Sequence, residues 1–141
     1  MSRFIVDASI ALKWFFDEGD EAQAEALAAS GATLLAPVLI QTEVANALWK
    51  KGRTGRVTVT EAINICAQLP AFFERLFPVE PLLPEAVALS FRLDHPIYDC
   101  IYLSLAHAAD CPLVTADRRL VQKIRGESGL PNILPLDHWR P

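Results

Sequence analysis

The chain has 141 residues, of which 52% are hydrophobic and 21% are charged, and its formal net charge is −4. This length and composition predict one globular domain over residues 1–141, with a core of substantial size. The negative charge excludes a protein whose whole surface attracts nucleic acid, so a nucleic-acid site requires a local basic patch.

The beginning of the chain predicts a buried strand followed by two helices. The apolar run at residues 3–7 predicts a short strand that ends in Asp7. The helix predicted for residues 8–16 is apolar nearly all round, so we expect it to bury one face in the core and another against a second surface. An acidic turn at residues 17–21 leads into a second helix, which ends near residue 30.

The rest of the chain alternates strands with helices. Further strands are predicted at residues 32–36, within residues 74–80, at residues 113–115 and at residues 133–136. Further helices are predicted at residues 37–51, 60–69, 84–94, 98–110 and 117–125. This alternation predicts an α/β fold, in which helices cover both faces of a parallel sheet. In such sheets, sites form beyond the carboxyl ends of the strands, where the strand order reverses.

The sequence also indicates where in the cell the protein is expected. No apolar run approaches the roughly 18 residues of a membrane span, and no secretion signal begins the sequence. Cys66, Cys100 and Cys111 are odd in number and lack Cys-x-x-Cys spacing, which favours a reduced chain. We therefore expect a cytoplasmic protein without membrane contact.

Two acids stand where predicted strands end and helices begin. Asp7 follows the run Phe4-Ile-Val6, and Asp117 follows the run Leu113-Val-Thr-Ala116. Each acid alone is explained as the N-cap of the helix that follows it. Their common position at strand ends nevertheless predicts that both carboxylates reach the same edge of the sheet.

Two further acids lie in apolar helical sequence. Asp99 is at the start of one predicted helix, and Glu43 has Val44 and Ala45 directly after it. A carboxylate in such surroundings costs several kcal/mol unless a cation meets it. Oxygen ligands without nearby cysteine or histidine select hard ions, Mg²⁺ or Mn²⁺. The acids together suit one ion with further acids around it, or a pair of ions about 4 Å apart.

Four motifs together resemble the PIN-domain ribonucleases, and most closely the VapC-type toxins of bacterial toxin–antitoxin pairs. The motifs are Val6-Asp-Ala-Ser9 with Ala11-Leu-Lys-Trp14, Glu43-Val-Ala-Asn-Ala-Leu-Trp49, His95-Pro-Ile-Tyr-Asp-Cys-Ile-Tyr102 and Val114-Thr-Ala-Asp-Arg-Arg-Leu120. They span nearly the whole chain. The resemblance implies a PIN-like three-layer α/β/α sandwich with a central, mainly parallel five-stranded sheet.

The resemblance also implies an activity and a site. The four acids that it assigns as catalytic and metal-binding are Asp7, Glu43, Asp99 and Asp117. The polar residues that would support them are Ser9, Asn46 and Thr115. The implied function is a Mg²⁺- or Mn²⁺-dependent endoribonuclease that hydrolyses RNA phosphodiester bonds with a metal-activated water. Cleavage would leave a 5′-phosphate and a 3′-hydroxyl.

Partners follow from local charge and from the resemblance. Basic clusters close behind the acid-bearing segments supply the candidates for RNA contact, which are Arg118, Lys50, Lys51 and Arg53. The resemblance further implies a cognate VapB-like antitoxin and a homodimer. The candidates for antitoxin contact are Trp14, Phe15 and Phe16, which core packing explains equally well.

Two alternative functions remain open. One is a catalytically silent PIN-like module that only binds partners. The other is a metal-dependent phosphatase on a similar fold. Haloacid-dehalogenase-like phosphatases carry Asp-x-Asp after the first strand, whereas this chain has Asp7-Ala-Ser9 and lacks the second acid. His95, which precedes Pro96, is expected to pack or cap rather than to take part in chemistry.

Overall fold

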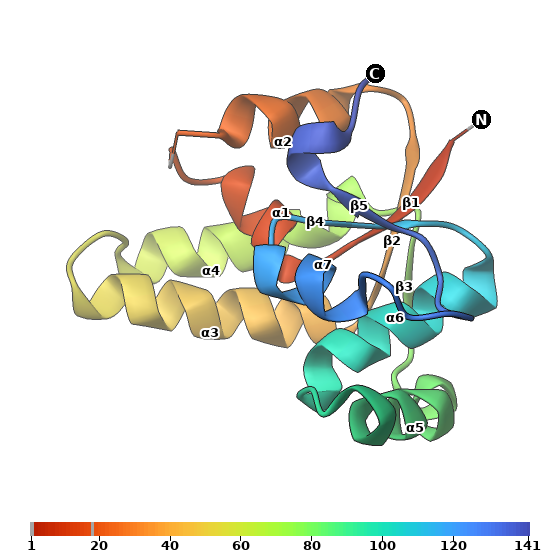
Figure 1. Cartoon of the computed structure of the whole chain (residues 1–141). Helices are drawn as coiled ribbons and strands as arrows, with labels where there is room; N and C mark the ends of the chain where they lie inside the picture. Colours follow the sequence, from red (N-terminus) through yellow and green to blue (C-terminus); the bar gives the residue numbers. More distant parts are fainter. Residues whose placement is uncertain (1, 18) are drawn as a thin grey trace.

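In residues 2–17 and 19–141, which the computed structural model describes, the chain forms a five-stranded sheet (Figure 1). The strands are β1 (Arg3–Val6), β2 (Thr33–Pro37), β3 (Arg75–Phe77), β4 (Leu113–Thr115) and β5 (Ile133–Pro135). They lie in the order β3-β2-β1-β4-β5, and every pairing is parallel. The first strand of the chain is therefore the central strand, and the predicted parallel sheet is confirmed.

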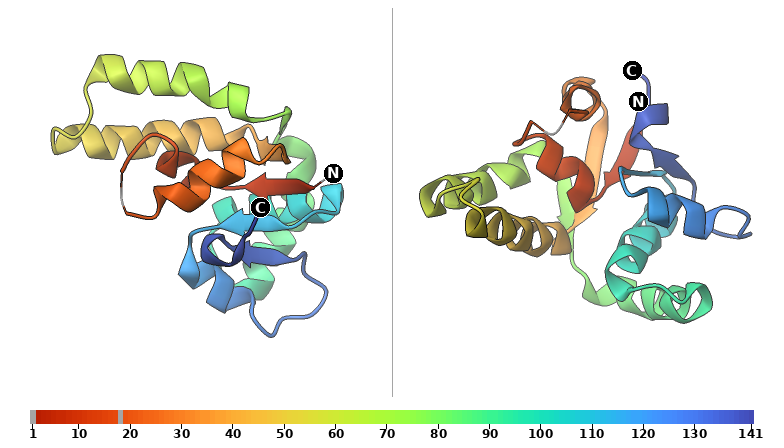
Figure 2. Two further views of the ribbon diagram at one scale, coloured as in Figure 1. Left: turned by 90° about the horizontal axis from the view of Figure 1, so that it is seen from above. Right: turned by 60° about the vertical axis from the view of Figure 1, so that its left-hand side comes forward.

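Helices cover both faces of this sheet. Within the described residues they are α1 (Ala8–Lys13), α2 (Glu21–Ala29), α3 (Leu39–Arg53), α4 (Val59–Gln68), α5 (Leu83–Leu93), α6 (Ile97–Ala109) and α7 (Arg118–Ile124). Short 3₁₀ helices are η1 (Leu69–Phe72), η2 (Glu80–Leu82) and η3 (Leu136–His138). Both views in Figure 2 show α1 to α4 on one side of the sheet and α5 to α7 on the other. The predicted three-layer α/β/α sandwich is confirmed.

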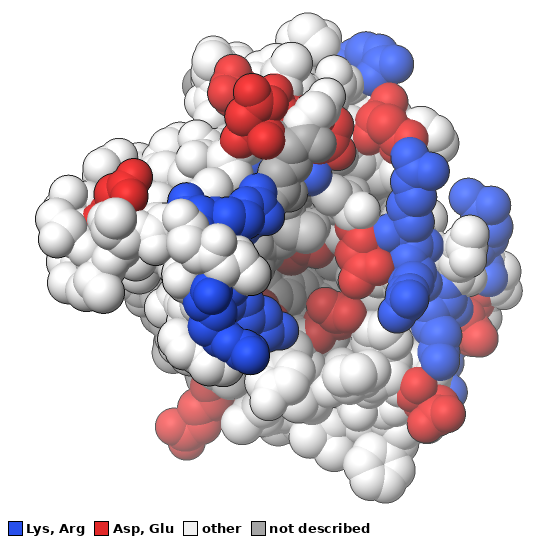
Figure 3. Space-filling view, turned by 90° about the vertical axis from the view of Figure 1, so that its left-hand side faces the viewer, with Lys and Arg blue, Asp and Glu red and all other residues white. Residues whose placement is uncertain are grey.

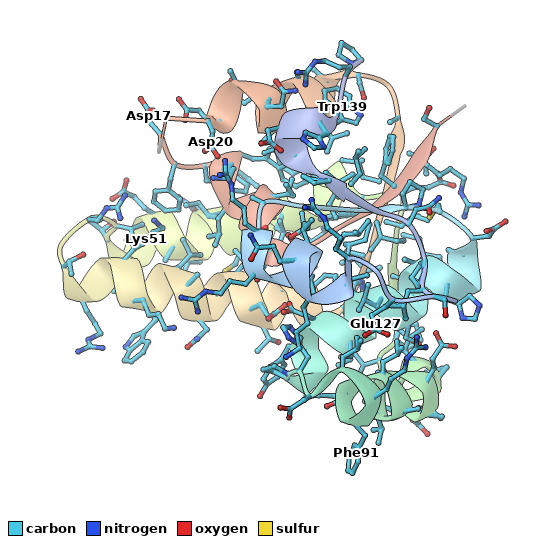
Figure 4. The ribbon with its side chains drawn as sticks, in the orientation of Figure 1. Asp17, Asp20, Lys51, Phe91, Glu127 and Trp139 are labelled. Atoms are coloured by element: carbon cyan, nitrogen blue, oxygen red, sulfur yellow. The ribbon has the colours of Figure 1, made fainter. Side chains whose placement is uncertain are left out.

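Helix α6 lies between the sheet and α5, and it is the most continuously buried helix. It contacts β1, β2 and β4 on one side and α5 on the other. Its buried residues run without a break from Cys100 to Ala106. Helix α5 shields α6 and exposes its own outer face, where Phe91 points away from the protein (Figure 4). Although α6 is largely apolar, no helix in the described residues is long and apolar enough to cross a bilayer.

Helix α1 ends at Lys13, three residues before the predicted end. The reason is tertiary contact, which overrides helical periodicity at this point. The indole of Trp14 stacks on Phe72 with a centroid distance of 4.3 Å, and its Nε1–H donates to the Ala24 carbonyl over 2.9 Å. Phe15 meets the same Phe72 ring edge-on at 5.6 Å. These contacts turn the chain away from the helix axis.

Other boundaries differ by one or two residues. The third helix was predicted to begin at Pro37, but Pro37 is the last residue of β2 and pairs with Phe77. The next N–H, that of Val38, donates to the Phe77 carbonyl over 2.8 Å, so the strand pairing continues past the proline. The predicted acidic turn contains Glu18, which lies outside the described residues.

The strand order places the ends of β1 and β4 side by side. Val6 of β1 is in register with Val114 of β4. From β1 the chain proceeds to β2 on one side, and from β4 it proceeds to β5 on the other. The order therefore reverses between these two strands, which is where a crevice is expected in a parallel α/β sheet. Asp7 comes directly after β1 and Asp117 comes two residues after β4, so both acids lie at this edge of the sheet.

Candidate active site

Asp7 is the buried carboxylate at the end of the central strand. It is 5% exposed and is the N-cap of α1, where its Oδ1 accepts from the Ile10 N–H over 3.3 Å. Ser9 Oγ donates to the same Oδ1 over 2.5 Å, and the Thr115 hydroxyl donates to Oδ2. All three donors are neutral, so they orient the carboxylate without cancelling its charge.

The environment of Asp7 favours its protonated form. Burial raises the pKa of this carboxyl from 3.8 to about 6, and the nearby charge of Asp99 adds to the rise. The hydrogen bonds from Ser9, Thr115 and Ile10 act in the opposite direction, because they stabilise the ionised form. A cation placed beside Asp7 would lower this pKa again, because it would stabilise the ionised carboxylate.

Glu43 is the second acid of the cluster. It lies half-buried on α3, and the Tyr102 hydroxyl of α6 donates to its Oε1 over 2.7 Å. Burial raises the pKa of Glu43, the hydrogen bond from Tyr102 lowers it, and the charge of Asp99 raises it again. The bond from Tyr102 fixes the position of a carboxylate that comes from the opposite layer of the sandwich.

Asp99 completes the cluster from the first turn of α6. Its side chain is 27% exposed, and its Oδ2 lies 2.6 Å from His95 Nε2, four residues earlier. The charge of Asp99 contributes to the raised pKa of both Asp7 and Glu43, so Asp99 is close enough to interact with each of them. The structure thus brings together three of the four predicted acids, from β1, α3 and α6.

Asp117 stands at the edge of this cluster. Its Oδ1 accepts from the N–H groups of Arg119 and Leu120, so it caps α7 as its sequence position predicted. Its own N–H donates to Thr115 Oγ1 over 3.0 Å, and this hydroxyl in turn donates to Asp7. Thr115 therefore joins the two strand-end acids through its hydroxyl.

The predicted supporting residues differ in what they touch. Ser9 and Thr115 both donate to Asp7, and Ser9 Oγ also accepts from the Ala116 N–H over 3.0 Å. Asn46 lies exposed on α3, one turn beyond Glu43. Among the contacts of the described residues, none joins Asn46 to an acid, so its supporting role stays a prediction.

Tyr102 and His95 were missed as partners of the acids. His95 was expected to pack or cap, yet its ring nitrogen contacts Asp99. Tyr102 was assigned no role beyond its place in the His95–Tyr102 motif, yet it is 1% exposed and its hydroxyl donates to Glu43. The short spacing between His95 and Asp99 could have indicated the first contact, whereas the second joins α6 to α3 and leaves no signal in local sequence.

Basic side chains flank the acids on the surface. Figure 3 shows acidic atoms in a hollow of this face, with lysine and arginine side chains on both sides. Arg118 is 85% exposed, and Arg53 stacks on the Trp49 ring at 5.1 Å. Lys51 Nζ lies 4.5 Å from the centre of the Phe16 ring. The RNA contacts of these residues and of Lys50 stay predictions.

The aromatic residues after α1 are half-buried rather than free. Trp14 and Phe15 pack on Phe72, and with Phe16 they line a pocket of about 280 Å³ between α1 and α2. The two readings of these residues, core packing and partner contact, are therefore both compatible with their positions. Their contact with an antitoxin stays a prediction.

The donor set suits a hard divalent cation. In the part of the chain that is described, no lysine or arginine forms an ion pair with Asp7, Glu43 or Asp99. Within the same residues, no three carboxylate, imidazole or thiol groups converge into a ready-made ligand set. Mg²⁺ keeps several waters and takes only one or two carboxylates directly, so such a set is not required. Neighbouring carboxylates that no lysine or arginine neutralises are the groups to which such an ion would bind.

A sequence profile of the PIN domain matches residues 4–126. The chain belongs to the PIN domain family. This PIN domain is 33% identical over 123 residues to Ribonuclease VapC3 of Pyrobaculum aerophilum, a match that covers 86% of this chain and 94% of that relative. It is 31% identical over 116 residues to VapC ribonuclease Mb0985 of Mycobacterium bovis, covering 82% and 87% of the two chains. The resemblance to PIN-domain, VapC-type proteins is confirmed.

Solved structures agree with this assignment. The PIN domain superimposes on PAE2754 from Pyrobaculum aerophilum with a TM-score of 0.66 and 25% identity, over 96% of this chain and 92% of that one. A toxin–antitoxin complex from Klebsiella pneumoniae matches with a TM-score of 0.63 and 14% identity, over 96% and 98% of the two chains. The second likeness supports the fold alone.

We expect the metal-free protein to lose stability as pH rises from about 4 to about 6. In this window folded Asp7 keeps a proton that the unfolded chain has released, so the free energy of unfolding falls by roughly 3 kcal/mol until Asp7 is ionised in both states. Asp7→Asn removes this dependence and is expected to be more stable than the wild type at pH 7.5.

Urea unfolding of both proteins in EDTA, at several pH values, measures the effect. Asp110→Asn, at an exposed acid after α6, is the matched control and should keep the wild-type pH dependence. Equal pH profiles for the wild type and Asp7→Asn would contradict the expectation.

Proposed function

We propose that this PIN domain is a Mg²⁺- or Mn²⁺-dependent endoribonuclease, the toxin of a VapBC-like toxin–antitoxin pair. The observation that carries the proposal is the cluster of Asp7, Glu43 and Asp99 at the carboxyl edge of the sheet, where none of the three pairs with a lysine or arginine among the described residues. The relatives that cover most of the chain are named ribonucleases, which supports the same activity.

The acids divide into roles according to their surroundings. Asp7 and Asp99 are the proposed direct ligands, with Glu43 and Asp117 as further acids around the ion. A bound divalent ion supplies an activated water and neutralises charge on the scissile phosphate. The chain's own hydrogen bonds hold the ligands in place, with Ser9 and Thr115 on Asp7.

The outer partners of the acids have a positioning role. Tyr102 holds Glu43 through a bond of 2.7 Å, and His95 holds Asp99 through a contact of 2.6 Å. Groups of this kind fix the orientation of a metal ligand and raise its affinity for the ion. The flanking arginines and lysines would attract the RNA backbone toward a site that is itself negative (Figure 3).

The proposed partners follow from the relatives and from the surface. Structures of toxin–antitoxin assemblies from Klebsiella pneumoniae and of VapBC-1 from Haemophilus influenzae share the fold. We place a VapB-like antitoxin segment on the pocket beside Trp14, Phe15 and Phe16, and we propose that the protein forms a homodimer. An RNA-cleaving toxin of this kind would act in the cytoplasm.

We expect Asp7→Asn and Asp99→Asn each to lower the rate of RNA cleavage at least about a hundredfold, because each removes a proposed ligand of the ion. Single-turnover cleavage of a labelled RNA in Mg²⁺ or Mn²⁺, with an EDTA control, measures the effect. Asp110→Asn is the matched control and should cleave at the wild-type rate. Cleavage by the two site variants at that rate would rule out the proposed mechanism.

We expect Tyr102→Phe to raise the metal concentration for half-maximal cleavage about tenfold, because the ring keeps its packing while Glu43 loses its hydroxyl partner. A metal titration of the cleavage rate measures this shift. Tyr98→Phe removes an exposed hydroxyl from the same helix and serves as the control. Identical titration curves for the two variants would show that Tyr102 has no positioning role.

We expect millimolar Mg²⁺ or Mn²⁺ to raise the melting temperature of the wild type, because the ion binds the folded state and relieves repulsion within the acidic cluster. At ten times the dissociation constant, binding adds about 1.4 kcal/mol. For a chain of this size that corresponds to roughly 5 °C. Calorimetry with and without metal measures the shift, and Asp99→Asn should reduce it. A wild type that does not respond would argue against metal binding at this site.

A further inference from the structure

A pocket of about 290 Å³ lies beside Asp117. Its walls come from the start of α2, the start of α7, the end of β5 and the η3 segment. Thr115, whose hydroxyl donates to Asp7, lines the same pocket. The pocket is therefore separated from the buried carboxylate of the acid cluster by a single side chain.

The C-terminal segment fixes the polar groups of this pocket. Arg140 Nη1 donates to the carbonyls of Asp137 and Trp139 over 2.8 and 2.7 Å. Gln23 Nε2, from α2, donates to the same Trp139 carbonyl over 2.5 Å. The guanidinium of Arg118 lies 3.7 Å from the Asp137 carboxylate. One wall of the pocket thus presents hydrogen-bond donors of arginine beside the acceptor oxygens of the Asp137 carboxylate.

The charges of the lining favour a neutral ligand over a phosphate. The lining includes three acids, Asp20, Asp117 and Asp137, and two arginines, Arg118 and Arg140. Asp20 lies in the loop before α2 (Figure 4) and is paired with Lys13 over 2.7 Å. With Asp20 paired to Lys13, two carboxylates and two guanidinium groups remain, so the lining carries no net positive charge and an anion gains little here. The volume is at the small end of pockets that hold small ligands, which suits one planar group rather than a helical segment of RNA.

We propose that this pocket holds one guanine base of the RNA, next to the bond that is cleaved. The proposal rests on the proposed function and assigns that site its base preference. Guanine presents adjacent N1–H and N2–H donors, which match the Asp137 carboxylate, and the acceptors O6 and N7, which match an arginine fork. Adenine has an amino group in place of O6 and no proton at N1, so it offers the wrong pattern to the same wall. Single-stranded RNA is read in this way, by bases that leave the stack.

The test uses short single-stranded RNAs that are identical except at one position, which is guanosine, inosine or adenosine in an otherwise uridine chain. The wild type is expected to cleave beside guanosine at least about tenfold faster, in kcat/KM, than beside adenosine. Inosine should fall between them, because it keeps N1–H and O6 but lacks the N2 amino group. Asp137→Asn should reduce the ratio of guanosine to adenosine about tenfold, whereas Asp110→Asn should leave it unchanged.

Cleavage without base preference, or a guanosine preference that Asp137→Asn leaves intact, would contradict the proposal that this pocket binds guanine. Neither result would contradict the proposed ribonuclease function. If no RNA is cleaved, the proposed function fails, and binding of the nucleosides guanosine and adenosine, followed by NMR, decides about the pocket. Selective binding of guanosine that Asp137→Asn weakens would support it. Absence of that binding would overturn it as well.

Discussion

The burial of Asp7 at the end of the central strand is the constraint on which the site depends. This carboxylate caps α1, accepts from Ser9 within its own helix and accepts from Thr115 across the sheet. It therefore joins the β1–α1 unit to the β4–α7 unit at the point where the strand order reverses. Every donor is neutral, so the hydrogen bonds orient the carboxylate and leave its charge without a cationic partner at a largely buried position.

Because its hydrogen-bond donors are neutral, Asp7 differs from a carboxylate in a structural ion pair, which has a lysine or arginine as its partner. An arginine beside Asp7 would stabilise the fold and would also occupy the space in which a divalent ion is proposed to bind. Instead, burial raises the pKa of both Asp7 and Glu43, and the charge of Asp99 adds to the rise. The protein thus tolerates repulsion at its centre, as functional sites commonly do at the expense of stability.

Much of this architecture could be predicted from local pattern, and the limits of prediction have physical causes. The strand-end positions of Asp7 and Asp117 follow from short apolar runs that lead into helices, and the parallel sheet puts such ends at one edge. The gathering of Glu43 and Asp99 depended on resemblance, because periodicity does not say which helices meet. Contacts distant in sequence were inaccessible. Phe72 ends α1 early through its stack with Trp14.

The strand order determines when the site can form during folding. The central strand precedes the other four strands in the chain, yet the hydroxyl that donates to its terminal acid belongs to Thr115, 108 residues later. Contacts so distant in sequence form late and slow folding, because a long loop must close before they contribute. A nascent chain that has not reached β4 lacks both the neighbouring strand and the Asp7–Thr115 bond. The contact between Thr115 and Asp7 therefore forms only after β4 has been synthesised and has paired with β1.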